Sequence, residues 1–343
     1  MTITASPSAI DSERIPLRTR LAAVDQGRLV ALVTLGLILF GGITVDGFWN
    51  VSNFSTLLRL SAALGILAVG SAIVIMGKGV DLSGAAIAAI AAQGAAHLWE
   101  VRKYGETKAI IVVIVLAIVM GLINGWLVAY VEVPALFATL GTWKLFEGLF
   151  QVSLFDKKIY ELPTGGSIIT WMGRGRFLGI PAPILIAAIV FLSVWIFLSR
   201  TSYGRLIRAM GDNPSTARLS GAPVRPLVVA TFVLAAFLAA IAGLVLIGKN
   251  GNYSTAYGGG NDLLFNAITA AVIGGVSLTG GKGSMFGVLA GTALTAVIVN
   301  LLTLQNFSVM SSTLIKGLVL VAALALDAWL HPRDEETAKA DDL

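Results

Sequence analysis

The residues of this chain that could do chemistry are mainly charged side chains inside apolar segments. They are Asp81, Lys144, Glu147, Lys316 and Asp327. An ionisable group is costly inside a membrane, and it normally faces a water-filled cavity or a group of opposite charge. These positions therefore favour the binding or passage of a polar solute over covalent catalysis.

Enzyme chemistry finds little support elsewhere in the sequence. There is no cysteine, and neither of the two histidines, His97 and His331, has a carboxylate or a second histidine at metal-ligand spacing. Residues 280–283 read Gly-Gly-Lys-Gly, whereas a phosphate-binding loop needs Gly, four residues, Gly, Lys and then Ser or Thr. We therefore predict no catalytic residue, no metal site, no cofactor and no ATP hydrolysis by this chain.

Two of the charged sites allow alternative interpretations. Asp81 and Ser83 lie between glycines, so either side chain could cap the next helix, or Asp81 could line a translocation path. Lys144 and Glu147 are three residues apart and share one helical face. They are interpreted either as a structural ion pair or as part of a substrate site.

The elements that position these residues follow from the composition. Of the 343 residues, 56% are hydrophobic and 13% are charged, about half the charge of a typical soluble domain. Because so little charge cannot cover a soluble surface, the sequence predicts an all-α, polytopic membrane helical bundle. At about 20 residues a crossing, we expect about ten transmembrane helices, with nine to eleven defensible, near 29–46, 60–77, 80–99, 109–131, 133–155, 182–199, 227–247, 263–279, 285–304 and 310–330.

Two polar tails flank the transmembrane domain, which we place at residues 29–330. The N-terminal tail, 1–28, contains acidic residues and no clear signal-peptide cleavage site, and the C-terminal tail is 331–343. With both tails and the loop 199–226 placed in the cytoplasm, thirteen Lys and Arg residues lie inside and nine outside, and this modest bias predicts that orientation. The net charge of +5 fits loops beside an anionic leaflet rather than a nucleic-acid surface.

The loop 199–226 contains signals for structure. Asn213 is a candidate N-cap, Pro214 fits the first helical position and Gly221 fits the position just past the end. Two short helices joined at Gly211 are therefore expected on the cytoplasmic surface, as a docking element for a soluble partner. A solvated basic loop without a partner is the alternative.

Glycines mark the places where helices break or approach closely. Gly77–Gly84 and Gly274–Gly283 interrupt apolar runs, and irregular backbone at membrane depth is tolerated where it lines a cavity. Residues 79–84 also echo residues 275–280, as in transporters with duplicated halves. The predicted helix order places both segments near the cytoplasmic side, which an inverted repeat would not do. Close helix packing is predicted at the glycines repeated every four residues, Gly121, Gly125, Gly283, Gly287 and Gly291.

With these features in place, the chain resembles the membrane permease subunit of bacterial ribose/xylose-type ABC sugar importers. The resemblance covers roughly residues 50 to 330, and it rests on four blocks: Gly79–Ser83, Pro134–Thr142, Gly204–Gly221 and Ala267–Gly281. It implies a fold like that of type II ABC importers, with broken or half helices. It also implies transport of a monosaccharide, such as a pentose, across the bacterial cytoplasmic membrane by alternating access.

The resemblance further implies partners and site residues. The partners are a second permease copy, a cytoplasmic ATP-binding subunit, a periplasmic or lipid-anchored sugar-binding protein and the surrounding membrane lipids, with no nucleic acid. The expected substrate path contains Asp81, Ser83, Asn124, Phe137, Thr139, Thr142 and Asn266. The expected ATPase-coupling residues are Gly204, Arg205, Arg208, Gly211, Asn213, Pro214, Ala217, Arg218 and Gly221.

The sequence departs from the family pattern at two places. The family usually has Glu-Leu-Asp where this chain reads Leu264-Phe265-Asn266, and it often has Arg where Glu147 stands. Both departures leave the identity of the sugar open. Related permeases for branched-chain amino acids, urea or nucleosides remain alternatives, as does an ion-coupled secondary transporter that would use Asp81, Lys144 and Glu147.

Overall fold

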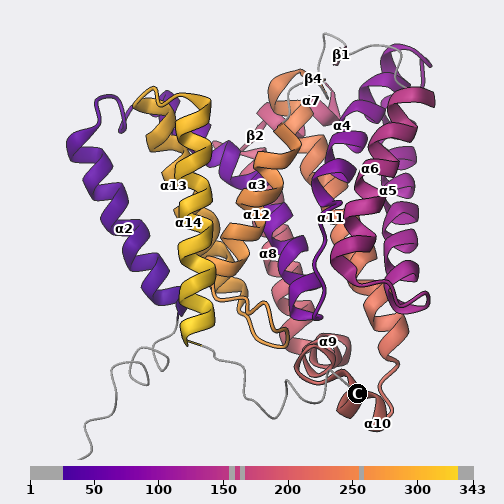
Figure 1. Cartoon of the computed structure of the whole chain (residues 1–343). Coiled ribbons are helices and arrows are strands. Elements are labelled where there is room, and N and C mark those ends of the chain that lie inside the picture. The colour runs from indigo at the N-terminus through magenta and orange to yellow at the C-terminus, as the bar shows by residue number, and fades with distance from the viewer. Residues whose placement is uncertain (1–25, 154–158, 163–166, 255–258, 331–343) are drawn as a thin grey trace, which may run out of the picture.

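A computed structural model of the chain describes residues 26–153, 159–162, 167–254 and 259–330. Most of the predicted N-terminal tail, the whole predicted C-terminal tail and His331 lie outside these residues. The described part is a bundle of long helices, most of which run roughly side by side (Figure 1). The predicted helical fold class is confirmed.

Within the described residues, ten long helices make up the bundle. They are α2 (Gln26–Thr44), α3 (Val51–Met76), α4 (Gly84–Glu100), α5 (Glu106–Ala129), α6 (Ala135–Ser153), α8 (Ala182–Arg200), α11 (Val224–Asn250), α12 (Gly259–Ile273), α13 (Met285–Leu304) and α14 (Val309–Leu330). Six of them, α2, α3, α5, α8, α11 and α13, are long and apolar enough to cross a membrane. The other four, α4, α6, α12 and α14, pack among them, and each of the ten coincides with one of the predicted crossings.

Two predicted helix boundaries are wrong by more than five residues, and the others by four or fewer. The crossing expected at 60–77 begins at Val51, because polar residues in the first turns of α3 interrupt the apolar pattern without ending the helix. One of them, Arg59, donates a hydrogen bond of 2.9 Å to the carbonyl of Gly173. The crossing expected at 263–279 ends at Ile273, since the chain turns at Gly275, where φ is +88°.

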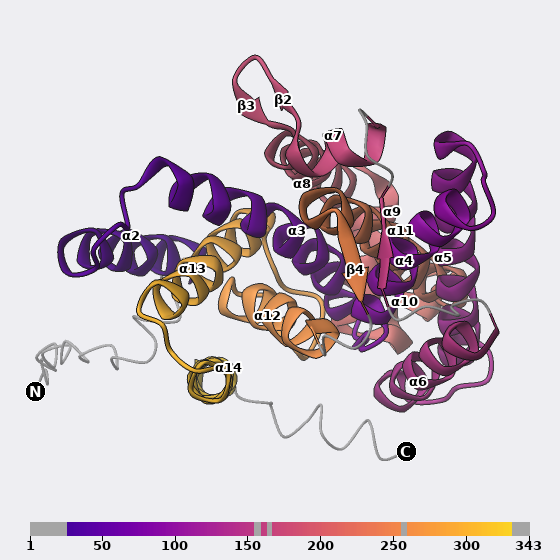
Figure 2. The same ribbon diagram turned by 90° about the horizontal axis from the view of Figure 1, so that it is seen from above.

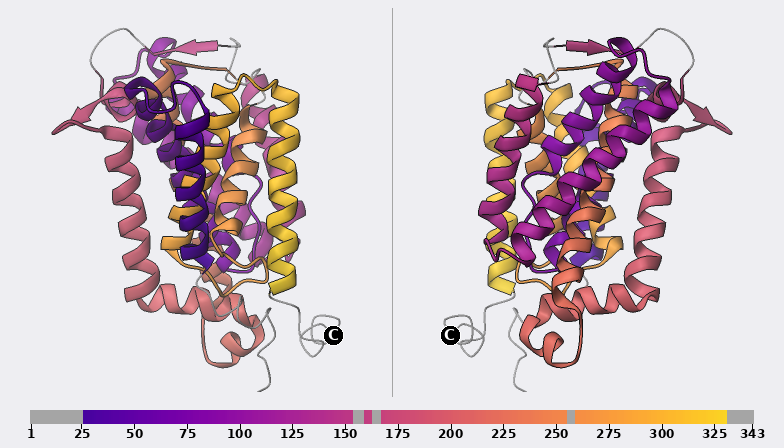
Figure 3. Two further views of the ribbon diagram at one scale, coloured as in Figure 1. Left: turned by 90° about the vertical axis from the view of Figure 1, so that its left-hand side faces the viewer. Right: turned by 90° about the vertical axis from the view of Figure 1, so that its right-hand side faces the viewer.

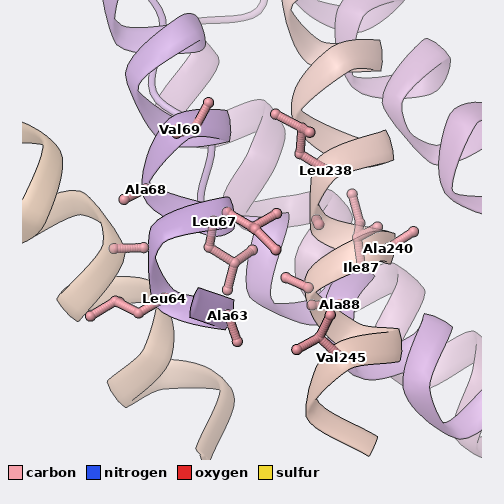
Figure 4. Close-up of a cluster of buried hydrophobic side chains, with 14 of the residues drawn as sticks. Ala63, Leu64, Leu67, Ala68, Val69, Ile87, Ala88, Leu238, Ala240 and Val245 are labelled. Atoms are coloured by element: carbon pink, nitrogen blue, oxygen red, sulfur yellow. The ribbon is translucent and has the colours of Figure 1, made fainter. Parts of the chain in front are cut away.

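The core lies where α3, α4 and α11 meet. Figure 4 shows Leu67 of α3, Ile87 of α4 and Leu238 of α11 among its side chains. Many of the other members are alanines, which bring the helix axes close together. Dispersion contacts between closely packed backbones stabilise a membrane bundle, because lipid tails offer no hydrophobic driving force.

Glycines allow the closest approaches between helices. A Cβ added to Gly243 of α11 would overlap the carbonyl oxygen of Ala88 in α4. At Gly291 of α13 it would overlap the carbonyl oxygen of Ala270 in α12, and at Gly125 of α5 it would lie 2.7 Å from Cα of Val229 in α11. The predicted close packing is confirmed at Gly121, Gly125, Gly287 and Gly291, whereas Gly283 lies in the loop before α13, where φ is +154°.

The two ends of the bundle differ. One end carries two short helices, α9 (Ser202–Asp212) and α10 (Pro214–Leu219), and is called the α9 end. The opposite, α7 end carries α7 (Ile168–Arg174) and an antiparallel pair of strands, β1 (Ile159–Glu161) with β4 (Asn252–Ser254). A second small pair, β2 (Arg176–Phe177) with β3 (Ile180–Pro181), projects sideways from the α7 end (Figures 2 and 3). The four short strands were not predicted from the sequence.

The tight contact between α12 and α13 generates a prediction. We expect Gly291→Val to destabilise the purified protein by about 1–3 kcal/mol, because the larger side chain must push Ala270 and its helix away. Thermal unfolding in detergent measures the effect. Gly36→Val is the matched control, since nothing lies within 4 Å of a Cβ at Gly36. Equal melting temperatures for the two variants would contradict the close-packing role.

Candidate functional site

Asp81 organises a buried polar cluster at the junction of α3 and α4. Its Oδ1 accepts hydrogen bonds from the backbone N–H of Ser83 at 2.8 Å and from the Ser83 hydroxyl at 2.6 Å. The Ser83 hydroxyl in turn accepts a hydrogen bond of 2.7 Å from the amide of Asn124 on α5. All three side chains are buried. The cluster forms because glycines end α3 after Met76 and let the chain cross to α4 within seven residues.

The start of α6 closes this cluster from another side. The Thr139 hydroxyl accepts a hydrogen bond of 3.1 Å from the backbone N–H of Leu82, and it lies 3.2 Å from the carbonyl oxygen of Val80. Thr142, one turn further on, is also buried and donates to the carbonyl of Thr139 at 3.2 Å. Two sequence blocks that are more than 50 residues apart therefore meet around Asp81.

Asp81 also lines a small cavity. The cavity has a volume of about 10 Å³, room for a single water molecule. Its walls include Ser71 of α3, Ala235 of α11 and Leu264 of α12. One oxygen of Asp81 thus bonds to Ser83, the residue just before α4, while the side chain borders a small space between four helices.

Two of the predicted path residues lie elsewhere. Phe137 is on the opposite face of α6 from Thr139 and is 65% exposed. Asn266 is half-buried on α12 and does not line the cavity, which α12 borders with Leu264 and Ala267. Sequence reasoning missed Ser71 and the fully buried Gln93 of α4; in each case the available signal was one polar residue inside an apolar helix.

Two ion pairs lie on helices α6, α12 and α14. Lys144 and Glu147 of α6 pair at 2.9 Å, and their side chains are 66% and 35% exposed. Lys316 of α14 pairs with Asp262 of α12 at 2.5 Å. Figure 2 shows these three helices along one side of the bundle, with α12 set between α6 and α14. The Lys144–Glu147 ion pair expected from the spacing is confirmed, whereas Asp262 was not identified as a partner.

The short helices at the α9 end have defined caps. The Thr201 side chain accepts a hydrogen bond of 3.1 Å from the backbone N–H of Gly204 and caps α9. Asn213 caps α10 through a hydrogen bond of 2.9 Å from the N–H of Thr216, with Pro214 in the first helical position. The predicted junction at Gly211 is wrong by two residues, because α9 continues to Asp212 before Asn213 breaks it.

The α9–α10 element packs directly beneath both helix breaks. A Cβ at Gly211 would overlap the carbonyl oxygen of Met76, the last residue of α3, and would come within 2.5 Å of the amide nitrogen of Gly281. Gly281 itself donates a backbone hydrogen bond of 2.9 Å to the Met76 carbonyl. The loop that holds Asp81 and the loop between α12 and α13 are therefore joined to each other and to α9.

The predicted coupling residues divide into two groups. Exposed residues of this element are Arg205, Asn213, Arg218 and Gly221, together with Tyr203 and Leu219, whose exposed fractions are 63% and 90%. Gly204, Gly211 and Ala217 are buried, and Arg208 and Pro214 are half-buried. The buried group holds the element against the bundle, while the exposed group forms a surface that another protein could contact.

The two echoing loops lie at the same end of the molecule. Residues 79–84 connect α3 to α4, and residues 275–280 belong to the connection from α12 to α13. Both loops reach the α9 end, as the Gly281–Met76 hydrogen bond requires. Of the two alternatives that the sequence left open, an error in the helix count or no inverted relation, the shared end favours the absence of an inverted relation.

Comparisons with known proteins agree with this arrangement. Residues 53–324 match the family described as branched-chain amino acid transport system / permease component. The ribose import permease protein of Escherichia coli is 31% identical over 310 residues, which cover 90% of this chain and 95% of that protein. The fructose import permease protein of Rhizobium meliloti is 31% identical, over 88% of this chain and 85% of that protein. The xylose transport system permease protein of Escherichia coli is 29% identical, over 86% of this chain and 89% of that protein.

No solved structure matches the chain. The family match spans both helix breaks, the Asp81 cluster and the α9–α10 element, so the parts of the molecule with the most distinctive geometry all lie within it. The chain belongs to the family of branched-chain amino acid transport system permease components, the membrane subunits of ABC importers.

Proposed function

We propose that this chain is the permease subunit of an ATP-driven importer that moves a monosaccharide across the bacterial cytoplasmic membrane. Relatives named for ribose, fructose and xylose import, each matching more than 80% of the chain, support a sugar as the substrate. ATP hydrolysis belongs to a separate subunit. The observation that carries the proposal is the contact of Gly211 with both Met76 and Gly281, because it ties a surface element to the internal polar cluster.

In this proposal the α9 end faces the cytoplasm, with both chain termini on the same side. The exposed surface of α9 and α10 receives the ATPase through Arg205, Arg218 and Leu219. A shift of α9 on nucleotide binding would displace the loop 77–83, since no side chain at Gly211 separates the two backbones. Movement of α9 driven by ATP would in this way displace the Asp81 cluster.

The second permease copy is proposed to pack against the side formed by α6, α12 and α14. Lipid cannot solvate the half-exposed charges of Lys144, Glu147 and Asp262, so this side faces water or another protein. Gly141 and Gly148 of α6 and Gly317 of α14 have nothing within 4 Å of a Cβ position, which leaves room for close approach of another helix. The sugar would pass between the two copies along the ion pairs.

A reconstituted system tests the function. Proteoliposomes that contain the chain with its cognate ATPase and binding protein are expected to accumulate at least one of radiolabelled D-ribose, D-xylose and D-fructose when ATP is supplied. Leucine, urea and uridine serve as competitors for the alternative solute classes. Uptake driven by an ion gradient without the ATPase would refute the ABC mechanism. It would instead favour an ion-coupled secondary transporter that uses Asp81, Lys144 and Glu147.

The docking surface generates the first functional prediction. We expect Arg205→Glu combined with Arg218→Glu to weaken ATPase binding about tenfold or more, because like charges placed at an interface cost several kcal/mol. Co-purification and surface plasmon resonance measure the effect. Arg102→Glu, an exposed charge reversal at the α7 end, is the matched control. Unchanged affinity in the double variant would exclude this surface as the docking site.

The Asp81 cluster generates a second prediction. Asp81→Asn keeps an oxygen for the Ser83 hydrogen bonds but removes the charge, whereas Ser83→Ala removes a hydroxyl that bridges Asp81 and Asn124. We expect Asp81→Asn to fold normally and to lose most sugar uptake. Quantified membrane yield and uptake separate the two effects. If yield and uptake fall together, Asp81 serves only as a helix cap.

The proposed subunit interface generates a third prediction. Gly148→Trp is expected to weaken dimerisation at least about tenfold, because the ring fills space that a partner helix would occupy. Single-molecule photobleaching in nanodiscs counts the copies. Gly36→Trp, on a helix outside the proposed interface, is the control. If the Gly148→Trp variant remains as dimeric as the Gly36→Trp control, the interface between the two copies lies elsewhere.

A further inference from the structure

Gln93 is a buried polar side chain in the middle of α4. It is 0% exposed, and neither its amide nitrogen nor its amide oxygen has a hydrogen-bond partner among the described residues. An amide buried in an apolar environment without a partner carries a substantial desolvation penalty. The helix around it is rich in alanine, so the same position would accept an apolar residue without this cost.

The neighbours of α4 show which side Gln93 occupies. Ala88 packs against Gly243 of α11, and Gly94 lies next to Val113 of α5. Gln93 is about 140° around the helix from Ala88, one turn before His97, whose ring meets Tyr160 edge-on at 5.2 Å. Gln93 therefore lies on the side of α4 turned away from α11, and α6, α12 and α3 are the remaining long helices in contact with α4.

The buried side of α6 supplies the chemical surroundings. It carries Thr139 and Thr142 near the α9 end, followed by Phe146 and Phe150 toward the α7 end. Because α4 and α6 run in the same direction (Figure 1), Thr139, which bonds to Leu82, fixes their register. Gln93, eleven residues after Leu82, is then level with Phe150, eleven residues after Thr139.

An amide that lies level with an aromatic side chain of a neighbouring helix is suited to a neutral polyol. A glutamine amide both donates to and accepts from adjacent hydroxyls, and the apolar face of a sugar ring packs on an aromatic side chain. An amino acid substrate would instead require charged groups for its carboxylate and ammonium. Gln93 also lies about 15 Å along α4 from Ser83, so the two polar positions follow one another toward the α7 end.

We propose that Gln93 contacts the sugar in the transport path, that α6 covers it in this conformation, and that it is uncovered when α6 separates from α4. The proposal rests on the function proposed above and names a residue that discriminates among substrates. Because the Gln93 amide is unpartnered, the covered state is less stable than it would be with an apolar residue at this position. When α6 separates from α4, the amide can form hydrogen bonds with water and with the sugar.

Substitution by an apolar residue of similar size provides the first test. We expect Gln93→Leu to raise the melting temperature of the purified complex and to reduce uptake of the transported sugar, among D-ribose, D-xylose and D-fructose, by at least about tenfold. Thr295→Val is the matched control, since Thr295 of α13 is also buried with an unpartnered hydroxyl. Its melting temperature should rise with no loss of uptake.

Cysteine labelling provides a second test that does not depend on transport rates. The chain contains no cysteine, so each variant has one reactive site. In the reconstituted complex, N-ethylmaleimide should react with Gln93→Cys at least about tenfold faster during ATP turnover with sugar than at rest. The control is Ala88→Cys, which faces α11 on the opposite side of the same helix and should remain unreactive in both states.

The outcomes separate this inference from the proposed function. Unchanged uptake by Gln93→Leu, or equal labelling of the two cysteine variants during turnover, would overturn the role of Gln93 while leaving monosaccharide transport intact. Should Gln93→Leu fail to fold, the labelling comparison decides alone. If the unmodified complex transports none of the three sugars, the proposed function is refuted, and with it the proposed contact between Gln93 and a sugar.

Discussion

The structure depends on a constraint that the membrane imposes on every interrupted helix. A helix that stops short of the water leaves backbone N–H and C=O groups unpaired, and lipid cannot pair with them. Here two interruptions satisfy each other, because the N–H of Gly281 bonds to the carbonyl of Met76. Gly211 of α9 fits against the same junction. The contacts that satisfy these backbone groups therefore also connect α9 at the surface to the interior of the bundle.

Much of the architecture could be predicted from the sequence because lipid-facing helices are long apolar runs with few ambiguities. The ends of the helices were harder to predict. Polar residues in the first turns of α3 concealed its start, and the break after α12 depends on left-handed glycines whose effect within an apolar run is not evident. The short strands β1 and β4 pair across almost 90 residues, and so short a pairing leaves no periodic pattern to detect.

The candidate site was predicted in part for a similar reason. Asp81, Ser83 and Asn124 were identified by residue type, and Thr139 by its sequence block, but their meeting depends on tertiary packing. Phe137 belongs to the same block as Thr139, yet successive turns of α6 direct it to the other face. Asp262 was missed because its partner Lys316 comes from a helix 54 residues away. Gln93 was missed because a single amide among alanines resembles a solvent-facing residue.

The β1–β4 pairing has a consequence for how the helices move. β1 follows α6 in the chain and β4 precedes α12, and the register joins Tyr160 to Tyr253. The pair thereby brings the chain beyond the end of α6 next to the chain before α12 at the α7 end, the end toward which Phe150 and Gln93 lie. At its other end, α6 is bonded through Thr139 to Leu82 in the loop before α4. Separation of α6 from α4 at Gln93 would therefore have to shift the β1–β4 pair or part its three residue pairs, so the strength of this pairing would help to set how readily Gln93 is uncovered.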